Sequence, residues 1–308
     1  MTSTLFRETL RSIRKTKARF ISIIAIVALG ISFFAGIKAA HPDMHETAVR
    51  YYEKNNLMDI WMVSTIGFSD EDINKIRNVE GVENAMGSKF VDGAVEVNGE
   101  PVSDMGGSQT ICRVYGLDIN KAINFENGEN DPTYINRVTL LDGRYPQNPG
   151  ECLVDQNGVA TPKEFVVGNK ITVVGVEENL DKQLRKTEFT IVGIIRTPRY
   201  VSIERGQTTV GSGSLGCFIY VPEDAFEIPF YSEICVKAEV DKSSSPYSDL
   251  YFKKVQSIIE NINKISSSCL DYTSGQVKEY FSIELEEAKL EYAAAEDDAK
   301  AQIDNATE

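Results

Sequence analysis

Histidine is scarce in this sequence, which has two histidines among 308 residues, at positions 41 and 45. Residues 46–308 therefore cannot supply the imidazole of a Ser-His-Asp or Cys-His catalytic arrangement. The spacing of His41 and His45 would suit a metal site on a helix, but Pro42 lies between them and the ligand set is incomplete. We predict no metal site, no cofactor and no enzymatic activity of the chain itself.

Phosphate-binding sequences are missing as well, since no G-x-x-x-x-G-K-S/T loop is present. Gly211, Gly213 and Gly216 have the G-x-G-x-x-G spacing of a dinucleotide-binding turn, but such a turn must open into a helix. Residues 217–221 are instead aromatic and β-branched, which predicts a strand. We interpret these glycines as part of a loop between two strands. The loop either has no functional role or is mobile and contacts a ligand or partner through Arg205, Gly211, Gly213 and Gly216.

Cysteine occurs five times but never as C-x-x-C, which disfavours a zinc site. The odd number leaves at least one thiol unpaired, and the sequence does not separate disulfides from buried thiols. Tryptophan occurs once, as Trp61 in the middle of an apolar run, and is expected in the core.

Charge is divided unevenly along the chain. Residues 1–40 carry a net charge of +6 and the remaining residues −20, and the acidic body argues against nucleic acid as a partner. Residues 20–37 carry no charge and approach the length needed to cross the ~30 Å hydrocarbon core. This run predicts a transmembrane helix over residues 20–40. A cleaved signal peptide is the alternative, but Lys38 would occupy the −3 position for cleavage after Ala40.

The basic residues ahead of the apolar run predict the orientation of the chain. They place the N-terminus in the cytoplasm and the residues after about 40 outside the cell membrane. Residues 1–19 are predicted as a basic amphipathic helix, which either lies on the inner leaflet or only orients the span. The positions predicted to set this orientation are Arg7, Arg11, Arg14, Lys15 and Arg19.

Residues 41–98 are predicted to form the first half of a folded outer domain. A strand pattern at 57–65 is followed by Ser69, which begins a capping box and a short helix, and by a strand pattern at 82–97 that could bend at a glycine. The sequence therefore indicates one βαβ unit.

Residues 231–279 are predicted to form the second half. They show a strand at 232–240, a helix at 247–265 with one apolar face, and a shorter third element at 267–275. Two such halves make a split βαβ, ferredoxin-like domain, and the expected fold class is α+β.

Residues 99–230 are predicted to be a β-rich subdomain inserted between the two halves. They show almost no helical period and are punctuated by turn signals. Strands are expected at 111–117, 137–141, 151–155, 170–176, 189–195 and 217–221.

Residues 280–308 contain no glycine or proline and are rich in alanine and glutamate. A narrow seam at heptad spacing predicts the start of an extracellular coiled coil. Such a helix needs a partner strand, so we expect the chain to be the N-terminal portion of a longer protein. The seam positions are Leu285, Ala288, Tyr292, Ala295, Ala299, Gln302 and Ala306.

Several stretches up to about residue 275 carry a resemblance to a known family. They are LRSIRKTKARFISIIAIVALGISFFAGIKAA, FSDEDINKIRNVEGVENA, LLDGRYPQNPGECLVDQ, VGNKITVVG, EFTIVGIIRTP and GCFIYVPEDAF. Their content and order resemble the permease subunits of MacB/FtsX-type ABC transporters. The segment after 280 is similar to the coiled-coil insertions of some Gram-positive members. Such permeases have at least three further transmembrane helices, whereas this chain shows no second apolar run.

The resemblance implies a permease whose first membrane helix passes conformational change between a separate cytoplasmic ABC ATPase and the outer domain. It places residues 7–19 near the ATPase or the inner leaflet and implies pairing with a second permease copy or paralogue. The client outside the cell is not indicated. The alternative is a single-pass extracellular sensor or binding protein without a transport partner.

Overall fold

The computed structural model describes residues 2–103, 107–156, 161–175, 180–200, 205–211, 213–240 and 248–307. The chain divides into two compact units, residues 1–54 and residues 55–308.

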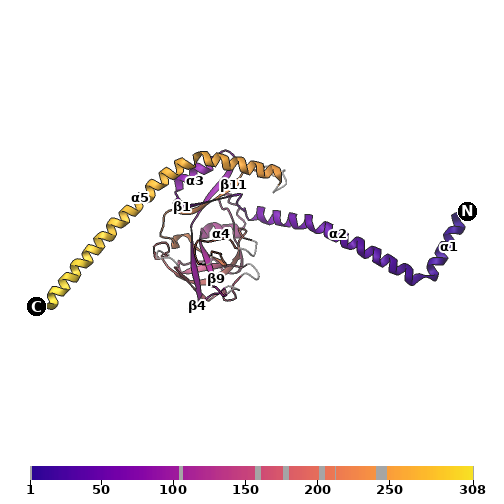
Figure 1. The fold of residues 1–308 in the computed structure, drawn as a ribbon, viewed down its shortest axis with the longest axis horizontal. Coiled ribbons are helices and arrows are strands. Elements are labelled where there is room, and N and C mark those ends of the chain that lie inside the picture. The colour runs from indigo at the N-terminus through magenta and orange to yellow at the C-terminus, as the bar shows by residue number, and fades with distance from the viewer. Residues whose placement is uncertain are drawn as a thin grey trace. The chain divides into compact units, whose positions relative to one another are not determined.

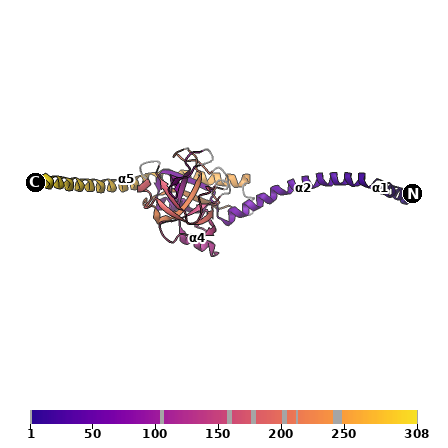
Figure 2. The ribbon, with the colours of Figure 1, turned by 90° about the horizontal axis from the view of Figure 1, so that it is seen from below.

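The first unit consists of two helices, α1 (Thr2–Lys15) and α2 (Lys17–Lys54) (Figures 1 and 2). The 38 residues of α2 form one helix that continues through Pro42. The predicted span of residues 20–40 lies within it, but residues 41–54 are helical too and do not begin the outer domain. Among the described residues, α2 is the one helix long and apolar enough to cross a membrane, with a mean hydropathy of 2.6 over its best 18 residues.

A three-stranded antiparallel sheet organises one part of the second unit. Its order is β1 (Ile60–Phe68), β11 (Tyr231–Ala238) and β2 (Val82–Ser88). The helices α3 (Asp70–Arg77) and α5 (Asp249–Thr307) pack against it, and Figure 1 shows the first part of α5 running along α3. The core beneath these helices contains Ile60, Ile73, Ile76, Ala85, Ile234, Val236, Ile258 and Ile262.

The complete ferredoxin-like arrangement is not confirmed. β1 and β2 flank the antiparallel β11, as in a split βαβ unit, but the described residues contain no fourth strand in this sheet. The third element predicted at 267–275 is part of α5. The physical reason is that buried positions continue at helical spacing through Ile258, Ile262, Cys269 and Thr273, so the same helix face stays covered.

The predicted boundary at residue 280 is also not a structural break, because α5 continues through it. Leu285 of the predicted heptad seam is 56% exposed. The side chains of the other seam positions lie outside the described residues.

The second part of this unit is an eight-stranded sheet that closes on itself. Its strands run in the order β4, β3, β5, β10, β7, β9 and β6, and β8 pairs with both β3 and β9. The six strands β3, β5, β10, β7, β9 and β8 therefore form a closed barrel without a free edge. The bounds are β3 (Phe90–Val97), β4 (Glu100–Pro101), β5 (Ile111–Leu117), β6 (Thr139–Gly143), β7 (Glu151–Asp155), β8 (Lys170–Val174), β9 (Glu188–Arg196) and β10 (Cys217–Pro222).

The six strands predicted in this region are confirmed. Three short helices accompany them: α4 (Ile119–Glu126), η2 (Leu180–Lys182) and η3 (Glu223–Ala225). The sequence prediction missed α4, although Asp118 caps it by accepting a hydrogen bond from the Lys121 amide.

The strand predicted at 82–97 is two strands in two different sheets. β2 ends at Ser88 in the three-stranded sheet, and β3 begins at Phe90 in the barrel. The Ser232 hydroxyl holds this crossing point, since it accepts from the Phe90 amide at 3.1 Å and donates to the Phe90 carbonyl at 3.0 Å. The barrel therefore begins at Phe90, ahead of the predicted boundary between residues 98 and 99.

A disulfide joins Cys112 of β5 to Cys217 of β10, which are directly paired positions of these parallel strands. Their Cα atoms are 4.7 Å apart, within the usual range for a disulfide. Cys152, Cys235 and Cys269 are buried thiols.

Candidate functional site

Residues 55–59, which directly follow α2, form a densely hydrogen-bonded polar segment of the second unit. Asn55 is 1% exposed, and its carbonyl accepts from the Arg137 amide at 2.9 Å. Its side-chain oxygen accepts from the Thr139 hydroxyl at 3.2 Å, and the Asn56 carbonyl accepts from the Asn136 amide at 2.9 Å. The chain is therefore fixed to the barrel from the first residue after α2.

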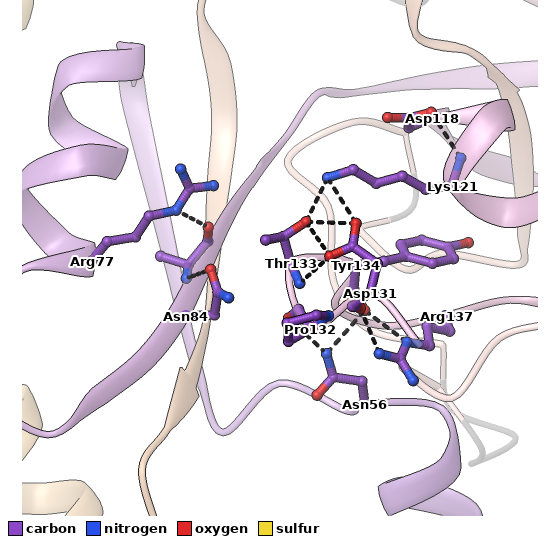
Figure 3. Close-up of polar contacts among 11 residues, drawn as sticks. Asn56, Arg77, Asn84, Asp118, Lys121, Asp131, Pro132, Thr133, Tyr134 and Arg137 are labelled. Carbon is purple, nitrogen blue, oxygen red and sulfur yellow. Dashed lines mark hydrogen bonds and ion pairs between the residues drawn. The ribbon is translucent and has the colours of Figure 1, made fainter. Parts of the chain in front are cut away.

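The receiving part of the barrel is the loop of residues 131–137 (Figure 3). The Asn56 side chain donates to the carbonyls of Pro132 and Tyr134, at 3.3 and 2.9 Å. Arg137 donates to the carbonyls of Tyr134, at 3.0 Å, and Asp131, at 2.6 Å. These contacts hold the loop on both sides of Asn56.

The same loop is braced from α4. Lys121 donates to the Thr133 hydroxyl at 2.9 Å and lies 3.8 Å from the Asp131 carboxylate. Burial works against the charge on Asp131, but hydrogen bonds from Thr133 outweigh it and lower the pKa of the carboxyl. Asp131 thus stays ionised and orders the loop that receives Asn56.

Asp59 ties the segment to the three-stranded sheet and to α5. Its carboxylate accepts from the Ala238 amide at 2.8 Å and from the Tyr251 hydroxyl at 2.6 Å, and it pairs with Lys237 at 3.0 Å. Lys237 also donates to the Leu57 carbonyl at 2.8 Å. Residues 55–59, which we call the junction, therefore contact the barrel, the small sheet and the first turns of α5.

A buried ion pair connects the segment after β9 to the three-stranded sheet. Arg199 lies 2.6 Å from Glu233 of β11, and both side chains are almost fully buried. Burial opposes the charge of the guanidinium, but Glu233 outweighs it and raises the pKa of Arg199. Trp61 donates to Glu233 at 2.6 Å and is 44% exposed, so the prediction that it lies in the core is wrong. Its indole N–H needs the carboxylate, which keeps the ring at the edge of the sheet.

A polar cleft of about 360 Å³ lies between α3 and β2 on one side and β5, α4 and η3 on the other. Its lining includes Asp70, Arg77, Asp118, Lys121 and Glu223. Burial, supported by the neighbouring Asp118, raises the pKa of Glu223. Charges of both signs in one cleft could bind a polar or zwitterionic ligand.

The residues predicted from the sequence lie in two different places. Arg7, Arg11, Arg14, Lys15 and Arg19 are exposed on α1 and the first turn of α2. Their roles in orientation and ATPase coupling stay predictions.

Arg205 is not a mobile surface contact. It is 3% exposed, and its guanidinium pairs with the buried Asp155 and donates to the Tyr200 carbonyl at 3.0 Å. The glycines follow in a hairpin-like turn in which Gly213 donates to the Val210 carbonyl at 3.1 Å, and Gly216 donates to the Ile111 carbonyl at 2.8 Å. The strand predicted after them is β10, so no helix follows the glycines.

A Cβ atom at Gly211 would lie 2.8 Å from Ile111, so this glycine packs against the barrel. A role of Gly211, Gly213 and Gly216 in binding stays a prediction. Over the described ranges, no group of three or more His, Cys, Asp or Glu side chains is placed to hold a metal ion.

The junction was not among the sites predicted from the sequence. One signal could have indicated it: Asn55-Asn56 directly after a long helix is a typical stop, because asparagine tolerates the left-handed backbone. Asn56 has φ of 47° and Asn136, its partner, φ of 56°. What a single sequence does not show is that these two asparagines meet.

Neither family models nor curated proteins match this chain. Among solved structures it is similar to the extracellular domain of the noncanonic ABC-type transporter YknZ from Gram-positive bacteria. The identity is 12%, the TM-score 0.31, and the match covers 63% of this chain and 86% of that one.

Two further similarities are of the same kind. The periplasmic region of MacB from Actinobacillus actinomycetemcomitans is 10% identical, with a TM-score of 0.32 and coverage of 66% of this chain and 82% of that one. A domain of a putative permease protein from Porphyromonas gingivalis is 13% identical, with a TM-score of 0.28 and coverage of 63% and 70%. Likenesses at this level identify no family.

Proposed function

We propose that this chain is the membrane-anchored portion of an ABC-transporter permease. In this proposal α2 passes conformational change between a separate cytoplasmic ATPase and the folded domain outside the membrane. The observation that carries it is the junction, because the membrane helix ends at Lys54 and the next residue, Asn55, is already buried and hydrogen-bonded in the outer domain. The order of the permease-like sequence motifs supports the same function.

The junction matters mechanically because a flexible linker would absorb a displacement of the helix. Here residues 55–59 are tied to the barrel loop through Asn136 and Arg137 and to the small sheet and α5 through Asp59. A movement of α2 would therefore act on both sheets. The cleft between them is where we expect a polar client or partner to sense that movement.

The lipid bilayer is the expected surrounding of α2. Its apolar side chains are exposed, with Ile26 at 73% and Phe33 at 70%, and so large an apolar surface needs a nonpolar solvent. The exposed basic residues of α1 would then face the inner leaflet or the ATPase, and a second permease copy is the expected partner within the membrane.

The test is an insertion of Gly-Ser-Gly-Ser between Lys54 and Asn55 in the full-length protein with its ATPase. We expect the outer domain to fold and the protein to reach the membrane, while client-dependent stimulation of ATP hydrolysis is lost. The matched control carries the same insertion at the Asn98–Gly99 turn, which is exposed. Normal stimulation in the Lys54–Asn55 insertion would contradict transmission through the junction.

The partner is tested separately by gentle extraction of the tagged protein from native membranes and mass spectrometry of what co-purifies. Recovery of an ABC ATPase supports the permease. Clean recovery without any ATPase would favour the single-pass sensor instead.

A further inference from the structure

A second pocket, of about 200 Å³, lies between β1 and α5. Its walls are mostly apolar and include Met62 and Phe68 of β1 and Ile262 and Ile265 of α5. One carboxylate, Asp72 of α3, also lines it. The pocket therefore combines apolar surface with a single negative charge.

Asp72 is fully buried, and only one of its oxygens is used. Oδ2 accepts from the Ser69 amide at 2.9 Å, from the Ser69 hydroxyl at 2.7 Å and from the Thr273 hydroxyl. Oδ1 is buried without a hydrogen-bond partner in the described part of the chain. Buried carboxylate oxygens are normally paired. The Cys269 thiol, which also lines the pocket, contributes to the hydrogen bonding of Asp72, but a thiol is a weak donor, so Oδ1 can accept from a stronger one.

The same pocket borders a strand edge that lacks a neighbour. β1 is the outer strand of the order β1-β11-β2, and it pairs only with β11 over the described ranges. Proteins usually protect such an edge with charged residues or proline, but the nine residues of β1, IWMVSTIGF, include neither. Val63 is 53% exposed on it and Ile66 37%. An uncharged, unprotected edge is typical of a strand that another strand covers.

We propose that the free edge of β1 binds an extended peptide strand from outside residues 1–308. Every second side chain of that strand would point into the pocket under α5. Most of this series would be apolar, and one lysine or arginine within it would donate to Oδ1 of Asp72. Main-chain hydrogen bonds to β1 give such a complex its affinity, and the pocket with its carboxylate selects the sequence. This inference concerns a different surface from the junction and does not depend on the transport function.

The test uses the protein in lipid nanodiscs and synthetic peptides of 9 residues, the length of β1. The first peptide alternates valine and threonine around a central lysine, and a second carries glutamate in place of the lysine. Trp61, the sole tryptophan, lies in β1 and reports binding by its fluorescence. We expect saturable binding of the lysine peptide and binding at least about tenfold weaker of the glutamate peptide, because a charge-assisted hydrogen bond is replaced by repulsion.

Two further comparisons separate the parts of the proposal. The variant Asp72→Asn should lose the preference for lysine over glutamate, whereas Glu71→Gln, a matched change of an exposed carboxylate on the same helix, should keep it. A lysine peptide that is N-methylated at every second residue, on the edge that would face β1, should not bind, because those amides can no longer donate hydrogen bonds to the β1 carbonyls. The comparison of peptides on the unchanged protein needs no variant, so it stands even if Asp72→Asn does not fold.

Three outcomes would overturn the proposal. In the first, the lysine peptide causes no saturable fluorescence change and a photoreactive version of it does not cross-link to β1 or α5. In the second, octylamine binds with the same dependence on Asp72 and competes with the lysine peptide, and methylation of the peptide amides does not weaken peptide binding. This result would assign the pocket to a small cationic amphiphile. In the third, the protein self-associates through β1, so that a second copy covers the edge.

Discussion

At the scale of single residues, one ion pair explains a sequence signature of the barrel. Arg144 donates to both oxygens of Glu151, each at 2.7 Å, and Glu151 also accepts from the Gln147 amide at 2.8 Å and from Asn148 at 3.0 Å. These residues stand in the stretch GRYPQNPGE. The Arg144 guanidinium is the main cause of a strongly lowered pKa of Glu151, and it outweighs the opposing effect of burial. This stretch therefore forms a turn between β6 and β7 that is held by hydrogen bonds to the Glu151 carboxylate.

Glu151→Gln is expected to lower the free energy of unfolding by about 2 kcal/mol at neutral pH, since a carboxylate with charge-assisted hydrogen bonds is lost. The pKa of Glu151 is lower in the folded state than in the unfolded one. Its contribution is therefore present above the unfolded value of about 4.5 and disappears as the pH falls. Urea unfolding between pH 3 and 7 should show a smaller pH dependence for the variant. Glu188→Gln, in an exposed pair with Lys170, is the control and should change little.

A comparison of Gly143 with Gly99 distinguishes the stability cost of backbone strain from the cost of steric overlap. Gly143, with φ of 78°, ends β6, and a Cβ atom there would overlap the Val192 carbonyl oxygen. Gly99 has a similar φ of 84°, but nothing lies within 4 Å of such an atom. We expect Gly143→Ala to cost roughly 3 kcal/mol of stability and Gly99→Ala about 1 kcal/mol, because only the first adds a steric overlap to the strain. Equal losses in urea unfolding would show that packing at Val192 does not matter.

At the scale of elements, residues 55–308 contain two sheets, and the chain crosses between them twice. The chain leaves the small sheet at Ser88, enters the barrel at Phe90, and returns to the small sheet only at Tyr231. The barrel is closed by β8, whereas the small sheet keeps the free edge of β1. This asymmetry explains why the barrel needs no partner strand and the small sheet can accept one.

The disulfide between β5 and β10 is expected to form in the native protein, because these strands lie outside the membrane in the proposed topology. Thiol labelling after denaturation should find 3 reactive cysteines without reductant, and all 5 after reduction. The bond closes a sequence separation of 105 residues, so its reduction should lower the free energy of unfolding by about 2–5 kcal/mol. Five reactive thiols in the unreduced protein would contradict the pairing of Cys112 and Cys217.

At the scale of the whole molecule, the uneven charge matches two environments. Exposed basic residues are concentrated on α1 and the first turn of α2, and most of the acidic remainder belongs to the compact unit of residues 55–308. The junction would make these two parts act together, although each is a compact unit. The charge pattern predicts opposite sides of the membrane for them.

Labelling of engineered cysteines in intact cells tests this topology. Glu100→Cys should react with a membrane-impermeant maleimide, whereas Glu8→Cys should react only after permeabilisation; both positions are exposed. The remaining native thiols are buried and give little background. Labelling of Glu8→Cys in intact cells would reverse the proposed orientation.

Much of the fold could be predicted from local pattern. The apolar run within α2 and the alternating strands of the barrel are visible in the sequence because span length and period-two alternation are properties of neighbouring residues. The helix α4 escaped because its eight residues bury only Ala122, which leaves almost no periodic signal. The extent of α5 was underestimated because its buried positions beyond residue 265 are Cys269 and Thr273, which weaken the apolar period.

The sequence by itself determined the apolar run within α2, the basic charge of the residues ahead of it and the positions of the barrel strands. Only the tertiary structure decided that Asn55 meets Thr139, that Cys112 meets Cys217, that Arg205 is buried against Asp155 and that β1 keeps a free edge. The reason is physical. Each of these features depends on contacts between residues 50 or more positions apart, or on the absence of such contacts, and chain closure over that distance leaves no trace in a local pattern.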